Sequence, residues 1–183
     1  VGHYVEQIRI DGKNVEVNND QLFEHTFKNV KSKHTIEVAF KIYTFTITFN
    51  AGDNGSLEGE LNQIIGYAGE TKAITAIPVE GYYLEQWTSN KHPDLNGSIE
   101  NPLTVTNVTF DIDDLTANFA INEYKVVFEA KDNGIIEGEI EQYVKHEENS
   151  KEVIAVPNEG YHFVKWSNDF TDSSLIIENV TED

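Results

Sequence analysis

Two acidic turns offer the residue types that bind calcium. Asp53-Asn54-Gly55 is followed by Glu58 and Glu60, and Asp132-Asn133-Gly134 is followed by Glu137 and Glu139. Calcium takes roughly six to eight oxygen ligands from a suitably folded loop. Neither turn matches a known calcium-loop pattern, and Asn-Gly by itself supplies the positive φ angles of a hairpin turn. We therefore expect hairpin turns and no cofactor here, with calcium as the alternative.

Aromatic residues form a second candidate site. The segments "PVEGYYLEQWTSN" (78–90) and "PNEGYHFVKWSND" (157–169) hold the two tryptophans of the chain in the same frame. Such rings could stack on a sugar, or they could be one core position of a repeated domain. For the first reading, the candidate ligand contacts are Tyr83, Tyr67 and His92, together with the loop "SNKHPDLNGSIEN" at 89–101.

Other chemistry finds little support in the residues. The six histidines are scattered without the clustering that a metal site needs. The chain has no Gly-x-Ser-x-Gly elbow, phosphate-binding loop or His-Glu-x-x-His pair. Carboxylates are too frequent for any pair of them to be specific. We expect neither a metal site nor an enzyme.

Composition limits the partners. The 183 residues carry a net charge of −19, which argues against nucleic acid and anionic membrane surfaces. No apolar run is long enough to span a membrane, so we expect no membrane insertion in this segment. Cysteine is absent, which excludes disulfides and thiol chemistry.

The strongest signal is an internal repeat. At an offset of 79 residues, Phe49 aligns with Phe128 and Trp87 with Trp166, and the register holds without a gap between them. The turns, the prolines and the Gly-Tyr pairs align at the same offset. The second copy then lacks seven residues of "KHPDLNG" (91–97), which predicts a surface loop in the first copy.

The repeat predicts three modules. Residues 1–41 end in a segment similar to 105–119 and are expected to form a related or half module. Residues 42–122 form the first whole repeat, and 123–183 form a second repeat that lacks its closing strand. The links at 41–42 and 121–123 are short, which favours stiff coupling and an elongated arrangement.

The expected class is mainly β. "YTFTITF" (43–49) alternates apolar and polar residues, as a half-buried strand does, and β-branched and aromatic residues dominate the other predicted strands. Segments such as 139–154 have apolar spacing that permits a helical turn, and no long amphipathic helix is expected elsewhere. In the module core we expect the aromatic residues that align between the copies: Tyr82, Trp87, Tyr161, Trp166, Phe49 and Phe128.

An alternating strand, a Gly turn, "A-x-P-x-x-G-Y-x-[FL]-x-x-W" and a closing "NPLTVTNVTFDIDDLTANF" together resemble the divergent internalin B-repeat family of bacterial surface repeats. The resemblance covers 43–121 as a whole copy and 124–183 as a shortened one, with Leu84 in place of the usual Phe. It implies small tandem β-rich modules, grasp-like or sandwich-like. It carries no active site.

The expected function follows from the repeat and the resemblance. We expect a non-catalytic segment of a bacterial cell-surface protein, extracellular, that acts as a stalk or an adhesion module beside neighbouring modules of a larger protein. The alternative is a specific glycan- or host-protein-binding module that uses the 89–101 loop and the exposed aromatic residues.

Overall fold

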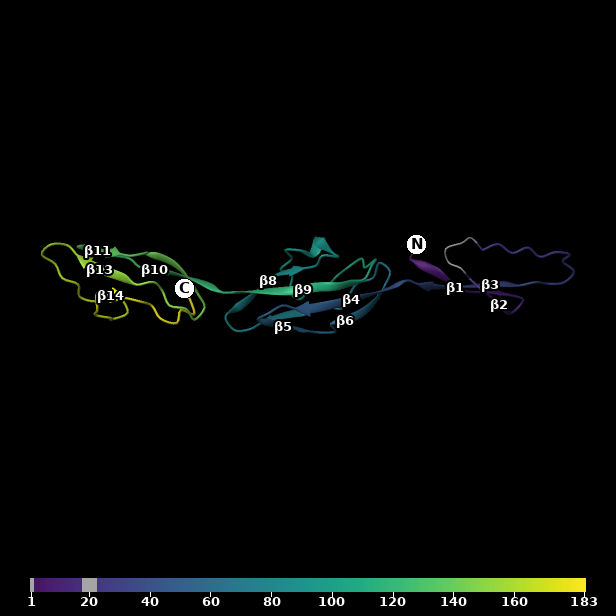
Figure 1. Cartoon of the computed structure of the whole chain (residues 1–183), viewed down its shortest axis with the longest axis horizontal. Helices are drawn as coiled ribbons and strands as arrows, with labels where there is room; N and C mark the ends of the chain where they lie inside the picture. The colour runs from purple at the N-terminus through teal and green to yellow at the C-terminus, as the bar shows by residue number, and fades with distance from the viewer. Residues whose placement is uncertain (1, 18–22) are drawn as a thin grey trace. The chain divides into compact units, whose positions relative to one another are not determined.

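The computed structural model describes residues 2–17 and 23–183 (Figure 1). Residues 1 and 18–22, which belong to the expected leading module, lie outside the described residues. The described residues form fourteen β-strands and one short 3-10 helix, η1 at Pro93–Leu95. None of the helices among them is long and apolar enough to cross a membrane. The prediction of a mainly β chain is confirmed.

The chain divides into two compact units. The first contains Val1–Ala51, Leu57–Ala76 and Gln86–Ala117. The second contains Gly52–Ser56, Ile77–Glu85 and Asn118–Asp183. The division runs through the first repeat, so a short part of that repeat belongs to the same unit as the second repeat.

The leading segment folds as a three-stranded antiparallel sheet in the order β2-β1-β3. Its strands are β1 (His3–Ile10), β2 (Lys13–Val15) and β3 (Ile36–Ile42). Ile8 is buried in this segment, whereas every residue of β3 is exposed. The turn after β1 is held by Asp11, whose carboxylate accepts bonds from the Thr35 N–H and the His34 ring.

The first repeat is built on a four-stranded sheet in the order β6-β4-β9-β8, with a two-stranded β5-β7 sheet. Its strands are β4 (Thr44–Ala51), β5 (Gly55–Glu58), β6 (Asn62–Gly66), β7 (Thr75–Pro78), β8 (Tyr82–Thr88) and β9 (Ile112–Ile121). The first strand β4 and the last strand β9 lie parallel to one another at the centre of the sheet. This topology favours the grasp-like of the two expected arrangements.

The alternation predicted for the opening strand determines its packing. Ile47 and Phe49 are buried, and Phe45 is half-buried on the same face. Tyr43 falls between β3 and β4 and is 45% exposed, so the buried face begins after it. β9 contributes three of the most deeply buried side chains of the repeat, Ile112, Leu115 and Ala117.

The second repeat has the same strands up to its Trp segment. Its strands are β10 (Glu123–Val127), β11 (Gly134–Glu137), β12 (Glu141–Lys145), β13 (Val153–Pro157) and β14 (Ser174–Leu175). β10 pairs with β12 as β4 pairs with β6, but this sheet has two strands, and β11-β13-β14 form another. The helical turn permitted at 139–154 is wrong: β12 and β13 lie there, because pairing with β10 and β11 overrides the local spacing.

The joins between modules repeat at the offset of 79. The Tyr43 N–H donates to the Gly2 carbonyl (2.9 Å), and the Tyr67 N–H donates to the Tyr43 carbonyl (2.8 Å). At the next join the Asn122 N–H donates to the Gly81 carbonyl (2.8 Å), and the His146 N–H donates to the Asn122 carbonyl (2.9 Å). One residue separates β3 from β4, and one separates β9 from β10. The strand β1 therefore corresponds to β8, and β3 corresponds to β9.

Candidate functional site

The paired tryptophans lie in the module cores. Trp87 is fully buried and meets Phe49 edge to face, with ring centroids 6.2 Å apart at 82°. Trp166 meets Phe128 in the same way, at 6.3 Å and 74°. Each indole N–H donates to a backbone carbonyl at 2.9 Å, that of Glu100 in the first repeat and that of Asp172 in the second. Both rings hold the fold together, and the fully buried Trp87 presents no face to a ligand, whereas Trp166 is half-buried.

Two of the expected core tyrosines are less buried. Tyr82 is half-buried at the start of β8, but Tyr161 is 58% exposed, so the expectation of a core position for Tyr161 is wrong. β8 is paired with β9 in the first repeat. Residues 161–166 have no such neighbour and form no strand, so the Tyr161 side chain is not held against the core.

A buried glutamine makes the same three hydrogen bonds in both repeats. Gln63 donates to the carbonyls of Glu60 and Lys72 and accepts the Lys72 N–H, at 2.9, 3.1 and 2.7 Å. Gln142 makes the same three bonds with Glu139 and Lys151, at 2.8, 3.1 and 2.6 Å. Both glutamines are 3% exposed. Each amide closes the loop between two strands, which is a structural role.

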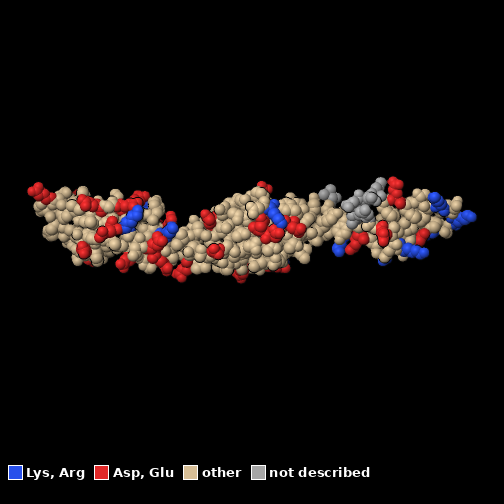
Figure 2. All heavy atoms as spheres, in the orientation of Figure 1, with Lys and Arg blue, Asp and Glu red and all other residues tan. Residues whose placement is uncertain are grey.

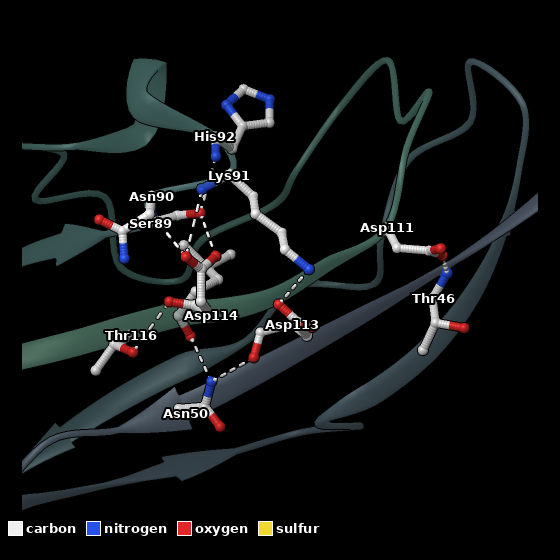
Figure 3. A network of polar contacts seen from close by, with 11 residues as sticks. Thr46, Asn50, Ser89, Asn90, Lys91, His92, Asp111, Asp113, Asp114 and Thr116 are labelled. Atoms are coloured by element: carbon white, nitrogen blue, oxygen red, sulfur yellow. Dashed lines mark hydrogen bonds and ion pairs between the residues drawn. The ribbon is translucent and has the colours of Figure 1, made fainter.

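The loop of the first repeat is fixed from below by a carboxylate of β9 (Figure 3). Asp114 accepts the Ser89 hydroxyl at 2.6 Å, the Asn90 N–H at 2.8 Å and the Lys91 N–H at 3.3 Å. Beside it, Lys91 forms an ion pair of 2.7 Å with Asp113. The loop at 91–97, which the difference in length between the repeats identified, is therefore held by hydrogen bonds and an ion pair.

The same network brings a serine, a histidine and an aspartate together. In a hydrolytic triad the imidazole lies between the carboxylate and the serine hydroxyl. Here the Ser89 hydroxyl donates directly to Asp114 and accepts the backbone N–H of His92, whose ring points away from both (Figure 3). The arrangement gives Ser89 no imidazole base, and its chemistry is that of a loop cap.

Electrostatics agrees with this role. The hydrogen bond from the Ser89 hydroxyl, helped by the backbone N–H groups of Asn90 and Lys91, lowers the pKa of Asp114 below its usual value. The hydrogen bond to Asp113 raises the pKa of Lys91. Both groups keep their charges at neutral pH, so neither is poised as an acid or a base.

The three candidate ligand contacts are divided between the two compact units. Tyr83 is 48% exposed and belongs to the second unit. In the first unit, Tyr67 is half-buried, with Phe45 6.5 Å away and with Gly2 beside it. His92 is half-buried, and its ring lies 5.7 Å from Phe110. Of the three, Tyr83 is the most exposed.

The acidic turns are tight turns, but the expectation of hairpins is wrong: β4 and β5 on either side of the first turn lie in different sheets, and so do β10 and β11 on either side of the second, because β5 pairs with β7 and β11 with β13. Asn54 and Asn133 have φ angles of 65° and 70°, and each precedes the glycine that opens the next strand. Glu60 and Glu139 form ion pairs with Lys72 and Lys151, so two of the candidate calcium ligands already have cationic partners. Within residues 2–17 and 23–183, no group of three or more His, Asp or Glu side chains is arranged to hold a metal ion.

Sequence reasoning missed the Asp114 network and the hydrogen bonds of Gln63 and Gln142, which we call the glutamine clamps. Ser89 and Asp114 are 25 residues apart, and no local pattern links them. The clamps had a signal, because Gln63 aligns with Gln142 and Lys72 with Lys151 at the common offset. A polar residue that keeps its place in both copies indicates a structural bond.

Fold and cores together define a class: tandem β-rich repeat modules. The family model described as "Divergent InlB B-repeat domain" matches residues 45–123 and 124–181. The chain therefore belongs to this family, whose members are repeats of bacterial surface proteins. No curated protein and no solved structure matches the chain.

Proposed function

We propose that this chain is a non-catalytic, cofactor-free spacer in an extracellular bacterial surface protein, where it sets the distance between a binding part and the cell. The observation that carries the proposal is the repeated join. The Gly2–Tyr43–Tyr67 and Gly81–Asn122–His146 hydrogen bonds match in partners and nearly in length. A spacer needs each module to grip the next in one defined way, and a repeated join supplies that.

Close packing at the joins supports the same function. A Cβ placed on Gly81 would lie 2.1 Å from the His146 ring, and one on Gly2 would lie 2.4 Å from the Tyr67 ring. Both glycines have positive φ, near +80°. In each case the ring of the later module lies against bare backbone, which limits rotation at the join. The high negative charge keeps such spacers soluble and apart.

Small-angle X-ray scattering of the whole chain tests the proposal. A spacer gives a distance distribution with a long tail, and it gives the same curve over a range of dilute concentrations. Variants at the joins should broaden that distribution, while variants elsewhere should not. A compact particle of globular dimensions would overturn the proposal.

A second candidate function, binding of a glycan or a host protein, is favoured by the loop. Asp114 and the Ser89–Asn96 bond hold the loop in one conformation, which lowers the entropy lost on binding. Ile99 is 72% exposed beside it. A glycan array and a pull-down with the intact chain test this function. A ligand lost in both Lys91→Ala and Ile99→Ser, with folding intact, would favour binding over spacing.

A further inference from the structure

The leading segment contains a loop whose two ends are held together by side chains. Phe27 stacks on His34, with the ring centroids 4.4 Å apart and the planes at 27°. The Asp11 carboxylate accepts bonds from the His34 ring at 2.8 Å and from the Thr35 N–H at 2.9 Å. Residues 28–33, which we call the basic loop, therefore rise from a fixed base.

The basic loop carries positive charge in an acidic chain. Residues 25–36 contain three Lys, two His and no Asp or Glu, whereas the rest of the chain contains ten Lys or Arg and all 32 acidic residues. Lys28, Lys31 and Lys33 are exposed, and among the described residues none of them is in an ion pair. Both lysines of the first repeat, by contrast, are paired with carboxylates. Figure 2 shows the blue Lys and Arg side chains gathered over the leading segment, whose strands are labelled in Figure 1.

The turn in the basic loop recurs in both repeats with other residues around it. Asn29, Asn107 and Asn179 occupy equivalent positions, and their φ angles are 52°, 54° and 52°. The backbone of the turn is therefore common to the three modules. Counted from the shared asparagine, the positions of the three loop lysines are occupied in the first and then the second repeat by Thr106, Thr109, Asp111, Glu178, Thr181 and Asp183.

The charge of this turn is thus particular to the leading segment, while its exposure is not. The three positions carry three positive charges in the leading segment, one negative charge in the first repeat and two in the second. In the whole module of the first repeat, Thr106 and Asp111 are exposed and Thr109 is half-buried. A module of this family therefore presents these positions to solvent, and the leading segment is the one that places lysines there.

We propose that the basic loop binds a linear phosphodiester polymer that carries no bases. Three exposed ammonium groups on one short loop attract a chain of anionic groups, and the binding releases the counterions of that chain. The fixed base of the loop keeps the three lysines close together before the polymer arrives, which lowers the entropy lost on binding. The proposal goes beyond the spacer function, because it gives the leading segment a ligand of its own.

The type of cation favours phosphate over sulfate. The basic loop contains Lys and no Arg. An ammonium group is a compact and strongly hydrated point charge, whereas guanidinium is weakly hydrated and forms planar bidentate pairs. Ions of similar hydration pair best, and a phosphate ester holds its water more strongly than a sulfate ester does. Point charges on flexible stems also suit a polymer whose phosphates have no fixed orientation.

Aromatic packing argues against a nucleic acid as the polymer. Proteins bind single-stranded nucleic acids with aromatic rings that stack on the bases. The basic loop contains no aromatic residue, and Phe27 at its base is half-buried between two imidazoles. His34 stacks on this ring, and His25 meets it edge to face at 4.6 Å and 77°. The loop therefore supplies cations for a phosphate chain without a platform for bases.

The charge of the remaining chain argues against a broad anionic surface such as a membrane. Outside residues 25–36, the 32 acidic residues outnumber the ten Lys or Arg. A broad negative surface repels such a chain as a whole, whereas a thin polymer can contact the basic loop alone. A flexible phosphodiester chain is therefore the anion that these charges favour.

Binding of fluorescently labelled poly(glycerol phosphate) to the full chain tests the proposal. Fluorescence anisotropy measures the affinity from about 50 to 200 mM salt. The test variant carries Lys28→Thr, Lys31→Thr and Lys33→Thr, because threonine occupies two of the counterpart positions in the first repeat. We expect the affinity to fall about tenfold to a hundredfold at low salt. The slope of log affinity against log salt should decrease by about two, since three phosphate contacts are lost.

The matched control removes the same charge from the second repeat. It carries Lys131→Thr, Lys145→Thr and Lys151→Thr, three positions that are exposed as the loop lysines are. Circular dichroism melting confirms that both variants fold. We expect the control to keep the affinity of the wild type within about twofold, since salt screens charges that lie away from the polymer. Equal losses in the two variants, or a wild type that does not bind the polymer at low salt, would overturn the proposal.

Competition identifies the chemistry of the anion. Unlabelled poly(glycerol phosphate) should displace the labelled polymer at a lower concentration of anionic charge than heparin, single-stranded DNA or phosphatidylglycerol vesicles. A competitor that acts at an equal or lower concentration would refute the assignment to a phosphodiester chain without bases.

Sedimentation velocity in the absence of polymer covers the remaining partner, which is the acidic surface of a second copy. We expect the wild type and the lysine variant to sediment alike. Self-association of the wild type that the lysine variant loses would overturn the proposal in favour of that contact. None of these outcomes alters the scattering curve that tests the spacer function, so the two proposals fail separately.

Discussion

The two repeats begin with the same strands, turns and clamps, and they differ in how their cores are finished. In the first, β9 lies in the centre of the sheet, orders β8 and buries Trp87 completely. In the second, the described residues offer no such strand, the Trp segment is irregular and Tyr161 is 58% exposed. The difference shows that the aromatic motif is not sufficient to make its own strand. It needs the partner strand that arrives last in the repeat.

The tryptophans give the largest test of this comparison. Trp87→Ala should cost about 3–5 kcal/mol of unfolding free energy, because it empties a closed core. Trp166→Ala should cost roughly 1–2 kcal/mol, since its ring is half-exposed and less transfer energy is lost. Urea unfolding followed by circular dichroism measures both, and fluorescence of the remaining tryptophan shows whether the other repeat stays folded. Equal costs would mean that the second core is closed in solution.

Glycines at equivalent positions separate backbone strain from packing at the join. Gly81 and Gly160 have φ angles of +79° and +86°, but a Cβ on Gly81 meets His146 whereas one on Gly160 meets nothing within 4 Å. Gly160→Ala should therefore cost about 1–2 kcal/mol for the left-handed conformation alone. Gly81→Ala should cost about 1–3 kcal/mol more, since the ring must shift. Thermal unfolding measures the difference, and identical losses would argue against a tight join.

Replacement of Gln63 and of Gln142 should destabilise the two repeats equally, because both repeats contain the same set of glutamine hydrogen bonds. Gln63→Ala and Gln142→Ala each remove three hydrogen bonds from a buried site. Each should cost about 1–3 kcal/mol, because backbone groups are left without partners. Denaturant unfolding of the two variants provides the measurement. A clearly larger loss in one repeat would show that the clamp also depends on the closing strand.

The smallest expected effect is on stability at low pH, and it concerns the first repeat alone. Asp114 has a lowered pKa, so it binds protons less readily in the folded state than in the unfolded state. Its stabilising contribution is complete above its unfolded pKa of about 3.9 and is lost as the pH falls through the lower folded pKa. Asp114→Asn should lower the melting temperature at pH 7 and flatten its fall below about pH 4.

The neighbouring carboxylate is the control for that measurement. Asp113 forms an exposed ion pair with Lys91 and is not hydrogen-bonded to the loop backbone. Asp113→Asn should change the melting temperature little, because exposed pairs stabilise weakly. Parallel pH profiles for the wild type and Asp114→Asn would show that the network contributes nothing.

Much of the fold could be predicted because the sequence contains two copies of the same repeat. The common offset placed Trp87 with Trp166 and Phe49 with Phe128, and within each repeat the Trp and Phe rings meet edge to face. The alternation of 43–49 predicted which face is buried, with Tyr43 as the exception. Periodicity is visible within a few residues, and a repeat is visible when the sequence is compared with itself. Both can therefore be detected in a single sequence.

Features that depend on distant partners could not be predicted. In the first repeat, the Tyr82 segment is ordered by β9, which begins at Ile112, well after β8 ends at Thr88. β12 forms in place of a helical turn because β10 pairs with it. The Ser89–Asp114 bond joins a loop to a strand, and composition alone does not reveal it. In each case a tertiary contact determines the structure, while the local sequence favours another structure or gives no signal.

The spacing of the joins has a consequence for how such a chain can change in length. The backbone hydrogen bonds of one join recur 79 residues later at the next, from Gly2 to Gly81 and from Tyr67 to His146. A duplication or an in-frame deletion of that length rejoins equivalent positions, so no new junction has to be invented. Recombination between copies can thus lengthen or shorten the protein by whole modules while each remaining module keeps a familiar neighbour.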